Sequence, residues 1–166
     1  NGSERFAKNQ RFGFFPSIGA AWIVSNEKFW GNNINKIIHN LKLKATYGLA
    51  GNDAIGKATD RFFYLSEVNL NASGRNFTWG ENFDYTVNGV STSRYANDKI
   101  TWEVSRKLNT GIEIGLFNSL EIQADFYTEH RSNILMSRAD IPTTMGLQTT
   151  PQTNVGEAKG KGIDLS

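Results

Sequence analysis

The feature that most constrains the fold is a long two-residue alternation of apolar and polar side chains in the second half of the chain. From Ile100 to Leu116 the even positions are mainly apolar, whereas the odd positions carry polar residues and glycine. Successive side chains of a β-strand point to opposite faces, so this period predicts a strand. Its length of about 17 residues exceeds the roughly 5–6 residues of an ordinary globular strand. We therefore expect one long strand over about 99–116.

The alternation resumes after a short polar link, which predicts a hairpin with a second strand over about 120–137. Placing Leu116 opposite Leu120 aligns the apolar faces of both strands and sets Lys107 opposite Glu129, an opposite-charge pair of the kind that stabilises a ladder. A shift of one residue would move every carboxylate to the apolar face. The turn is predicted at about 117–119, and a bulge near Asn118 is the alternative that would displace this register.

Shorter alternating segments predict three further strands, at about 12–24, 40–50 and 155–166. The links between the strands alternate in length: the turns at about 25–39 and 117–119 are short, whereas the stretches at about 51–98 and 138–154 are long and polar. Outer-membrane barrels have short periplasmic turns and long outer loops, and a soluble domain rarely contains a loop of some fifty residues. We expect an all-β fold of antiparallel strands from a transmembrane β-barrel, with long extracellular loops.

The charge pattern fits a membrane wall with one lipid-facing and one water-facing side. No apolar run approaches the roughly 18 residues of a transmembrane helix, but a barrel strand needs only alternate apolar residues. Arg106 is the misfit on the apolar face. It lies about ten residues from the tight turn, where the hydrocarbon band ends and the cost of a cation is small, and His130 is its expected neighbour.

Composition and the chain ends limit the remaining possibilities. The net charge of +2 does not indicate a nucleic-acid partner, and the absence of cysteine excludes disulfides and thiolate metal sites. The first residues lack the features of a signal peptide, and the last ones lie in an alternating segment. We therefore expect one section of a longer barrel, lacking a plug domain and a closing strand, whose two edge strands need partners.

Several motifs, which together cover most of the chain, occur in the same order as in a known protein family. They include Arg11-Phe12-Gly13-Phe14-Phe15-Pro16-Ser17, Leu41-Lys42-Leu43-Lys44-Ala45-Thr46-Tyr47-Gly48-Leu49-Ala50-Gly51-Asn52-Asp53, Ile100-Thr101-Trp102-Glu103, Gly115-Leu116-Phe117-Asn118 and Lys161-Gly162-Ile163-Asp164. In this order they resemble the SusC/RagA-type TonB-dependent transporters of Bacteroidetes.

The resemblance implies a wall section of an outer-membrane importer of nutrients, either oligosaccharides or peptides. It implies a SusD-like surface lipoprotein as partner, energy supplied by TonB through a plug domain outside this chain, and contact with outer-membrane lipid. We expect no cofactor. Two other functions stay open on the residues alone. A soluble or surface β-sandwich that binds carbohydrate would use the same alternation around a closed core, and a passive porin would need no plug.

Candidate site residues fall into two groups, neither of which forms a catalytic or metal site. The expected lumen-facing residues are Lys42, Lys44, Glu113, Glu121, Gln123 and Asp125. The expected outer-loop contacts to ligand or lipoprotein are Phe63, Tyr64, Trp79 and Tyr85, although such aromatic residues more often pack within a loop. The two histidines lie far apart, and the strand carboxylates have nothing nearby to tune them for acid–base chemistry. We expect the chain not to be an enzyme.

Overall fold

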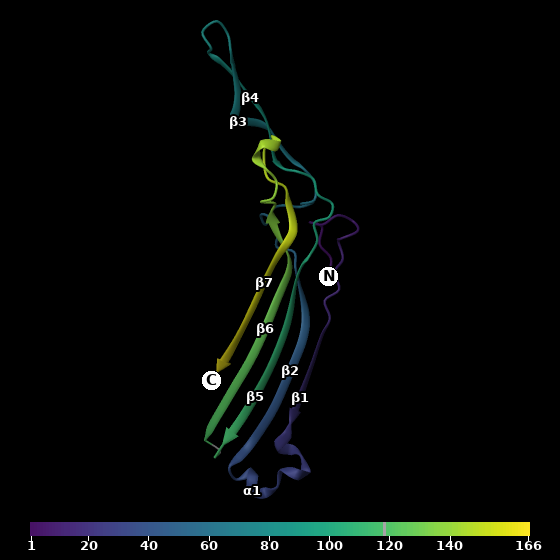
Figure 1. Cartoon of the computed structure of the whole chain (residues 1–166), viewed down its shortest axis with the longest axis vertical. Coiled ribbons are helices and arrows are strands. Elements are labelled where there is room, and N and C mark those ends of the chain that lie inside the picture. The colour runs from purple at the N-terminus through teal and green to yellow at the C-terminus, as the bar shows by residue number, and fades with distance from the viewer. Residues whose placement is uncertain (118) are drawn as a thin grey trace. The chain divides into compact units, whose positions relative to one another are not determined.

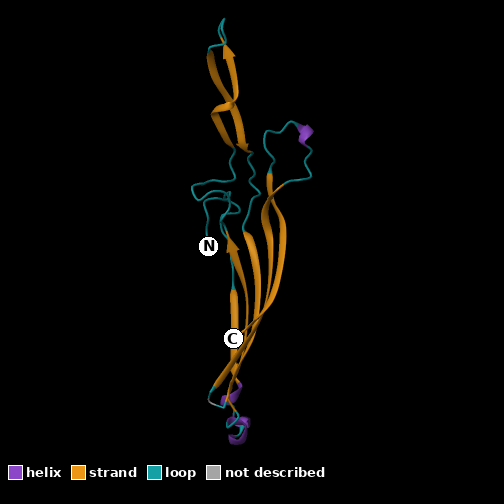
Figure 2. Ribbon diagram, turned by 90° about the vertical axis from the view of Figure 1, so that its left-hand side faces the viewer, coloured by secondary structure: helices purple, strands orange, loops and turns teal. Residues whose placement is uncertain are grey.

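The computed structural model describes residues 1–117 and 119–166 and consists mainly of β-strands (Figure 2). The elements in chain order are β1 Ser17–Ile23, the 3₁₀ turns η1 Val24–Asn26 and η2 Lys28–Trp30, α1 Asn32–Asn35, β2 Ile38–Asn52, β3 Glu67–Trp79, β4 Tyr85–Arg94, β5 Glu103–Leu116, β6 Leu120–Ser137, η3 Thr143–Met145 and β7 Gln152–Leu165. Within the described residues, the helices are all too short or too polar to cross a membrane.

Five strands form one open sheet in the order β1-β2-β5-β6-β7, and β3 and β4 form a separate two-stranded sheet. The pairs β1–β2, β2–β5 and β5–β6 are antiparallel, and the strands lie side by side in Figure 1. Gln123 and Ser166 exchange backbone hydrogen bonds of 2.8 and 3.0 Å, which is the pattern of an antiparallel ladder between β6 and β7. The predicted class, an all-β chain of antiparallel barrel strands, is confirmed as a partial, unclosed barrel.

The predicted register of the central hairpin is confirmed. Leu116 pairs with Leu120, and Lys107 pairs with Glu129 further along the ladder. The register continues without a shift as far as Val104 and Ser132. The predicted turn at 117–119 includes Asn118, where a bulge was the alternative, and this residue lies outside the described part of the chain.

Two strands begin later than the alternation suggests. The first begins at Ser17 rather than near residue 12, although the carbonyl of Pro16 already accepts a hydrogen bond of 2.9 Å from Leu49 N. The strand expected from about 99 begins at Glu103. Ile100 and Trp102 are only 2% and 6% exposed, so the start of the alternation reflects burial in a small core and not strand pairing.

The stretch expected as a loop over about 51–98 contains a β-hairpin, which corrects the sequence prediction. Strands β3 and β4 pair antiparallel from Glu67–Arg94 to Trp79–Tyr85, with register shifts along the ladder. The apolar residues also change from even to odd positions, from Val68 and Leu70 to Phe77 and Trp79 along β3. The hairpin therefore lacks the continuous alternation by which the longer strands were recognised.

The chain divides into two compact units. The first unit comprises Asn1–Gly13, Asp53–Trp102 and Asn133–Gly156, and the second comprises Phe14–Asn52, Glu103–Ser132 and Glu157–Ser166. Most of the buried apolar residues lie in the first unit, where the Phe6 and Trp102 rings are 5.2 Å apart. In the described part of the second unit, Val24 is the one buried hydrophobic residue.

Candidate functional site

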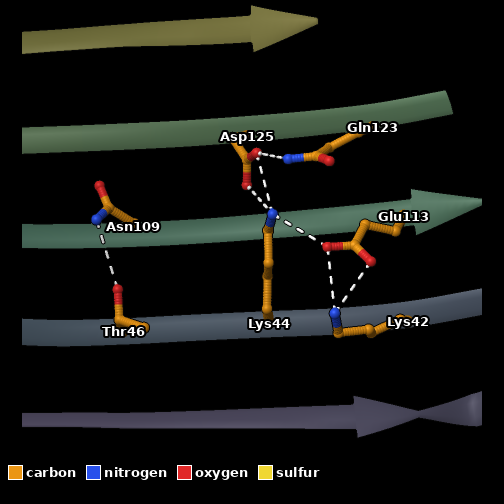
Figure 3. A network of polar contacts seen from close by, with 7 residues as sticks. All are labelled: Lys42, Lys44, Thr46, Asn109, Glu113, Gln123 and Asp125. Carbon is orange, nitrogen blue, oxygen red and sulfur yellow. Dashed lines mark hydrogen bonds and ion pairs between the residues drawn. The ribbon is translucent and has the colours of Figure 1, made fainter. Parts of the chain in front are cut away.

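The polar face of the second unit's sheet carries a network of paired charges. Lys42 and Lys44 come from β2, Glu113 from β5, and Gln123 and Asp125 from β6 (Figure 3). These residues share a face because strand positions of equal parity point the same way and the registers align them in rows. The structure thus brings together five of the six residues predicted to face the lumen.

Lys44 connects three strands. Its Nζ lies 3.2 Å from Glu113 Oε1 and 3.0 Å from Asp125 Oδ1. Figure 3 shows the lysine side chain extending over β5, where Asp125 meets it from β6. Gly111 stands between Lys44 and Asp125 in the same row. A Cβ on Gly111 would lie 2.1 Å from Asp125 Oδ1 and 2.3 Å from Lys44 Cε. The Lys44 side chain can therefore extend over this position because Gly111 has no side chain.

The remaining members complete the hydrogen bonding of the network. Lys42 Nζ donates to both Glu113 oxygens at 3.3 and 3.1 Å, and Gln123 Nε2 donates to Asp125 Oδ2 at 2.6 Å. All four charged side chains are partly exposed, between 26% and 34%. Such a surface can offer donors and acceptors to a polar solute while its own charges stay balanced.

A second polar cluster on the same face was predicted only in part. The predicted pair Lys107–Glu129 forms at 3.7 Å. Glu129 also accepts hydrogen bonds from Ser105 Oγ at 2.6 Å and Arg131 Nε at 2.9 Å, and Arg131 lies 3.7 Å from Glu103. Applying the hairpin register to every odd position would have assembled this cluster from the sequence.

Glu121 is the predicted lumen residue that stays outside the network. It pairs with Gly115 in the ladder and is exposed on the same face. Among residues 1–117 and 119–166 no ion pair or hydrogen bond engages its carboxylate. The site therefore consists of the Lys42–Asp125 network, the Glu129 cluster and one open carboxylate.

The opposite face of the sheet is apolar in rows that run across the strands. Three such rows are Trp22–Leu43–Ile112–Ala124, Ala20–Ala45–Thr110–Phe126 and Ile18–Tyr47–Leu108–Thr128. The large side chains are exposed, including Trp22 at 48% and Phe126 at 41%. A soluble sandwich would cover this face with a second layer about 10 Å away. The described residues of this unit form no such layer.

The predicted aromatic contacts lie in the first unit and have different surroundings. Phe63 is 4% exposed, and the Arg94 guanidinium lies 4.2 Å from its ring centroid. Tyr64 is half-buried and meets the Phe62 ring edge-on at 6.4 Å. Trp79 and Tyr85 pair across the end of the β3–β4 ladder and are 61% and 66% exposed. Phe63 is therefore a packing residue, whereas Trp79 and Tyr85 are open to a ligand.

Two further observations concern ionisable groups. In the described part of the chain, no three His, Asp or Glu side chains gather as metal ligands would. Beyond the end of β6, Arg138 Nε donates to Asp140 Oδ1 at 3.0 Å. This hydrogen bond lowers the pKa of the Asp140 carboxyl below its ordinary value because it stabilises the charged form.

The sequence model of the family "TonB dependent receptor-like, beta-barrel" matches residues 1–166. The chain belongs to this family. TonB-dependent receptor P3 of Formosa agariphila is 32% identical over all of this chain, which spans 15% of that receptor. TonB-dependent receptor SusC of Bacteroides thetaiotaomicron is 28% identical, again over all of this chain and 16% of its own length.

Solved structures agree with the sequence relatives. The RagAB peptide importer in its closed-closed state matches 98% of this chain and 16% of its own with a TM-score of 0.72 and 28% identity. The open-open state of the same importer matches with a TM-score of 0.70. The resemblance to SusC/RagA-type transporters, stated above from motifs, is thereby confirmed, and the chain spans about a sixth of the proteins it matches.

Proposed function

We propose that this chain forms part of the barrel wall of a TonB-dependent importer in the bacterial outer membrane. The observation that carries the proposal is the five-stranded sheet, whose apolar face is exposed and whose other face holds the charge network. In a barrel of this family the apolar rows contact lipid and the polar face lines a wet lumen. Lys42, Lys44, Glu113, Glu121, Gln123 and Asp125 are then lumen residues.

The substrate class we propose is a soluble oligomer, an oligosaccharide or a peptide. A peptide is supported by the name of one structural relative, a peptide importer, and an oligosaccharide is what the resemblance to SusC-type transporters implies. Lumen groups that alternate donors and acceptors suit the hydroxyl and amide groups of either oligomer. Trp79 and Tyr85 are exposed aromatic residues able to stack on a sugar face or on a peptide side chain.

Two protein partners belong to the proposal. A SusD-like lipoprotein would contact the long connections that leave the sheet after β2 and after β6, which emerge at the same end because the strands are antiparallel. TonB would act through a plug domain outside this chain. We propose transport, not catalysis, as the role of the wall, in keeping with relatives named as receptors and importers.

The assignment of the two faces can be tested with adjacent cysteines, because the chain has none of its own. Ala45 and Thr46 are neighbours on opposite faces. In the membrane-embedded receptor that contains this chain, we expect Thr46→Cys to react with a water-soluble, membrane-impermeant maleimide. Ala45→Cys should react only with a lipid-soluble one. Equal labelling of both positions, or recovery of the receptor without membranes, would refute the wall assignment.

Active import is tested separately with labelled oligosaccharides and peptides. We expect cells carrying the receptor to accumulate one of these classes, and accumulation to stop when the proton gradient that drives TonB is collapsed. A passive porin would continue to equilibrate the solute across the outer membrane after the collapse. That outcome would be compatible with a barrel wall but would contradict active import.

A further inference from the structure

The apolar face of the sheet contains one cationic groove. Its volume is about 550 Å³, and its lining residues belong to β2, β5, β6 and β7. These four strands are neighbours in the sheet (Figure 1). The side chains that matter here are Tyr47, Arg106, Thr128, His130, Lys159 and Lys161. All of them belong to the second unit.

The registers place these residues in two adjacent rows. Arg106 pairs with His130, and Leu108 pairs with Thr128. Counting back along the antiparallel ladder from the Gln123–Ser166 hydrogen bonds sets Lys159 opposite His130 and Lys161 opposite Thr128. The close approach of Gly162 to the Tyr127 ring agrees with this count. Three cations and one histidine therefore converge from three strands.

The cations of the groove lack the partners that every cation of the polar network has. Lys42, Lys44, Lys107 and Arg131 each lie within 4.0 Å of a carboxylate on their face. Within residues 1–117 and 119–166, none of Arg106, Lys159 and Lys161 has such a carboxylate. Two acidic residues border the groove. Glu129 is part of its lining, but its carboxylate accepts hydrogen bonds from Ser105 and Arg131 on the polar face. Glu157 Oε2 lies 3.4 Å from His130 Nε2. The groove thus retains an excess of positive charge.

The position of the groove relative to the apolar rows indicates the kind of anion it can meet. The rows through Leu43 and Ala45 carry no charged residue in β1, β2, β5 or β6, whereas the cations begin at the level of Tyr47 and Leu49, toward the end of β5 remote from the tight turn. An aromatic side chain beside cations is typical of the headgroup level of a membrane. Long Lys and Arg side chains can extend there while their stems cover apolar surface.

We propose that this groove binds the phosphate groups of a membrane lipid whose acyl chains cover the adjacent apolar rows. Arg106 would hold a phosphate through paired guanidinium hydrogen bonds, Lys159 and Lys161 would neutralise its charge, and the Thr128 hydroxyl would donate a further hydrogen bond. The inference rests on the proposed function, because it needs this face to lie in lipid. It adds a specific lipid site to a wall that would otherwise contact lipid without selectivity.

The test compares a bisphosphorylated disaccharide lipid with its dephosphorylated form, bound to the purified full-length receptor in nonionic detergent. We expect the phosphorylated form to bind more tightly and inorganic phosphate at millimolar concentration to leave it bound, because the acyl chains add affinity. Arg106→Gln, Lys159→Gln and Lys161→Gln should each weaken it about fivefold. Lys107→Gln is the matched control: it removes an adjacent cation from the opposite face and should leave lipid binding unchanged.

Equal affinity for the two lipids, or an equal loss in Lys107→Gln, would overturn the inference, and so would complete displacement by inorganic phosphate. Loss of the folded barrel on heating in detergent would be compared across all four variants, so that a folding defect is not counted as lost binding. The labelling of Ala45→Cys separates the two proposals. If that position is lipid-accessible and the phosphorylated lipid is not preferred, only the lipid site fails.

Discussion

Neighbouring strands are about 4.8 Å apart, so a side chain reaches the second strand away only where the residue between them leaves room. Gly111 provides this room for Lys44, which contacts Asp125 on β6 from its place on β2. Gly111 has an ordinary strand conformation, so a glycine is needed here because it lacks a side chain and not because of its backbone flexibility. One small residue thereby links β2 directly to β6.

Gly111→Ala tests this role. The added Cβ would overlap the ends of the Lys44 and Asp125 side chains, which must move apart, and overpacking of this kind costs about 1 kcal/mol or more. We expect the midpoint of denaturant unfolding of the full-length receptor to fall accordingly. Gly74→Ala is the control, since nothing lies within 4 Å of that position, and an equal effect of both substitutions would argue against a spacing role.

Removal of the Lys44 ammonium group should leave Asp125 without its ion pair. Glu113 keeps Lys42 after Lys44→Met, whereas the amide of Gln123 is the one side-chain partner that Asp125 keeps among the described residues. We expect the melting temperature of the receptor to fall, and Lys44→Met/Asp125→Leu to recover part of the loss because the unpaired carboxylate is gone. If the double variant melts lower than the single one, the ion pair is not what Lys44 contributes.

At the scale of elements, the sequence alone was sufficient to predict the pairing of two strands where one face stayed apolar over many residues. The β5–β6 register followed from matching faces, because a shift at Leu116 would have exposed the carboxylates of both strands on the wrong side. The β3–β4 hairpin was missed because its register shifts interrupt the alternation. The sequence does not distinguish Phe63 from the other aromatic residues expected as loop contacts, because its burial beneath Arg94 depends on chain segments distant from it in sequence.

The β3–β4 hairpin presents Trp79 and Tyr85 as an exposed pair. If they stack on substrate, Trp79→Ala/Tyr85→Ala should weaken substrate binding about tenfold with little change in receptor stability, as measured by calorimetry on the purified receptor. Phe63→Ala is the contrasting variant. Truncation of a buried ring costs about 3–5 kcal/mol of local stability, so it should increase proteolysis of the 53–102 segment. If the double variant binds substrate normally, Trp79 and Tyr85 do not contribute to substrate binding.

At the scale of the whole molecule, the sheet stabilises itself through its ladders and its charge network but does not bury its apolar rows. Trp22, Leu43 and Phe126 remain 48%, 39% and 41% exposed, which in water would leave a large apolar surface open to aggregation. The alternation alone could not decide what covers this face, because a soluble core and a lipid bilayer select the same pattern. The family and the exposed rows together favour lipid.

The free-energy cost of placing a charged residue within the apolar rows therefore distinguishes lipid from water as the medium that covers them. Ile112 lies in the row Trp22–Leu43–Ile112–Ala124, and a lysine near the middle of the hydrocarbon band of a barrel costs about 2–4 kcal/mol. We expect Ile112→Lys to destabilise the receptor by this amount in unfolding measured in bilayers. Asn109→Lys, three residues away on the polar face, should cost much less because its ammonium group stays in the wet lumen. If the two lysines cost the same, the apolar rows are not in contact with lipid, and both the wall assignment and the lipid site that depends on it would have to be abandoned.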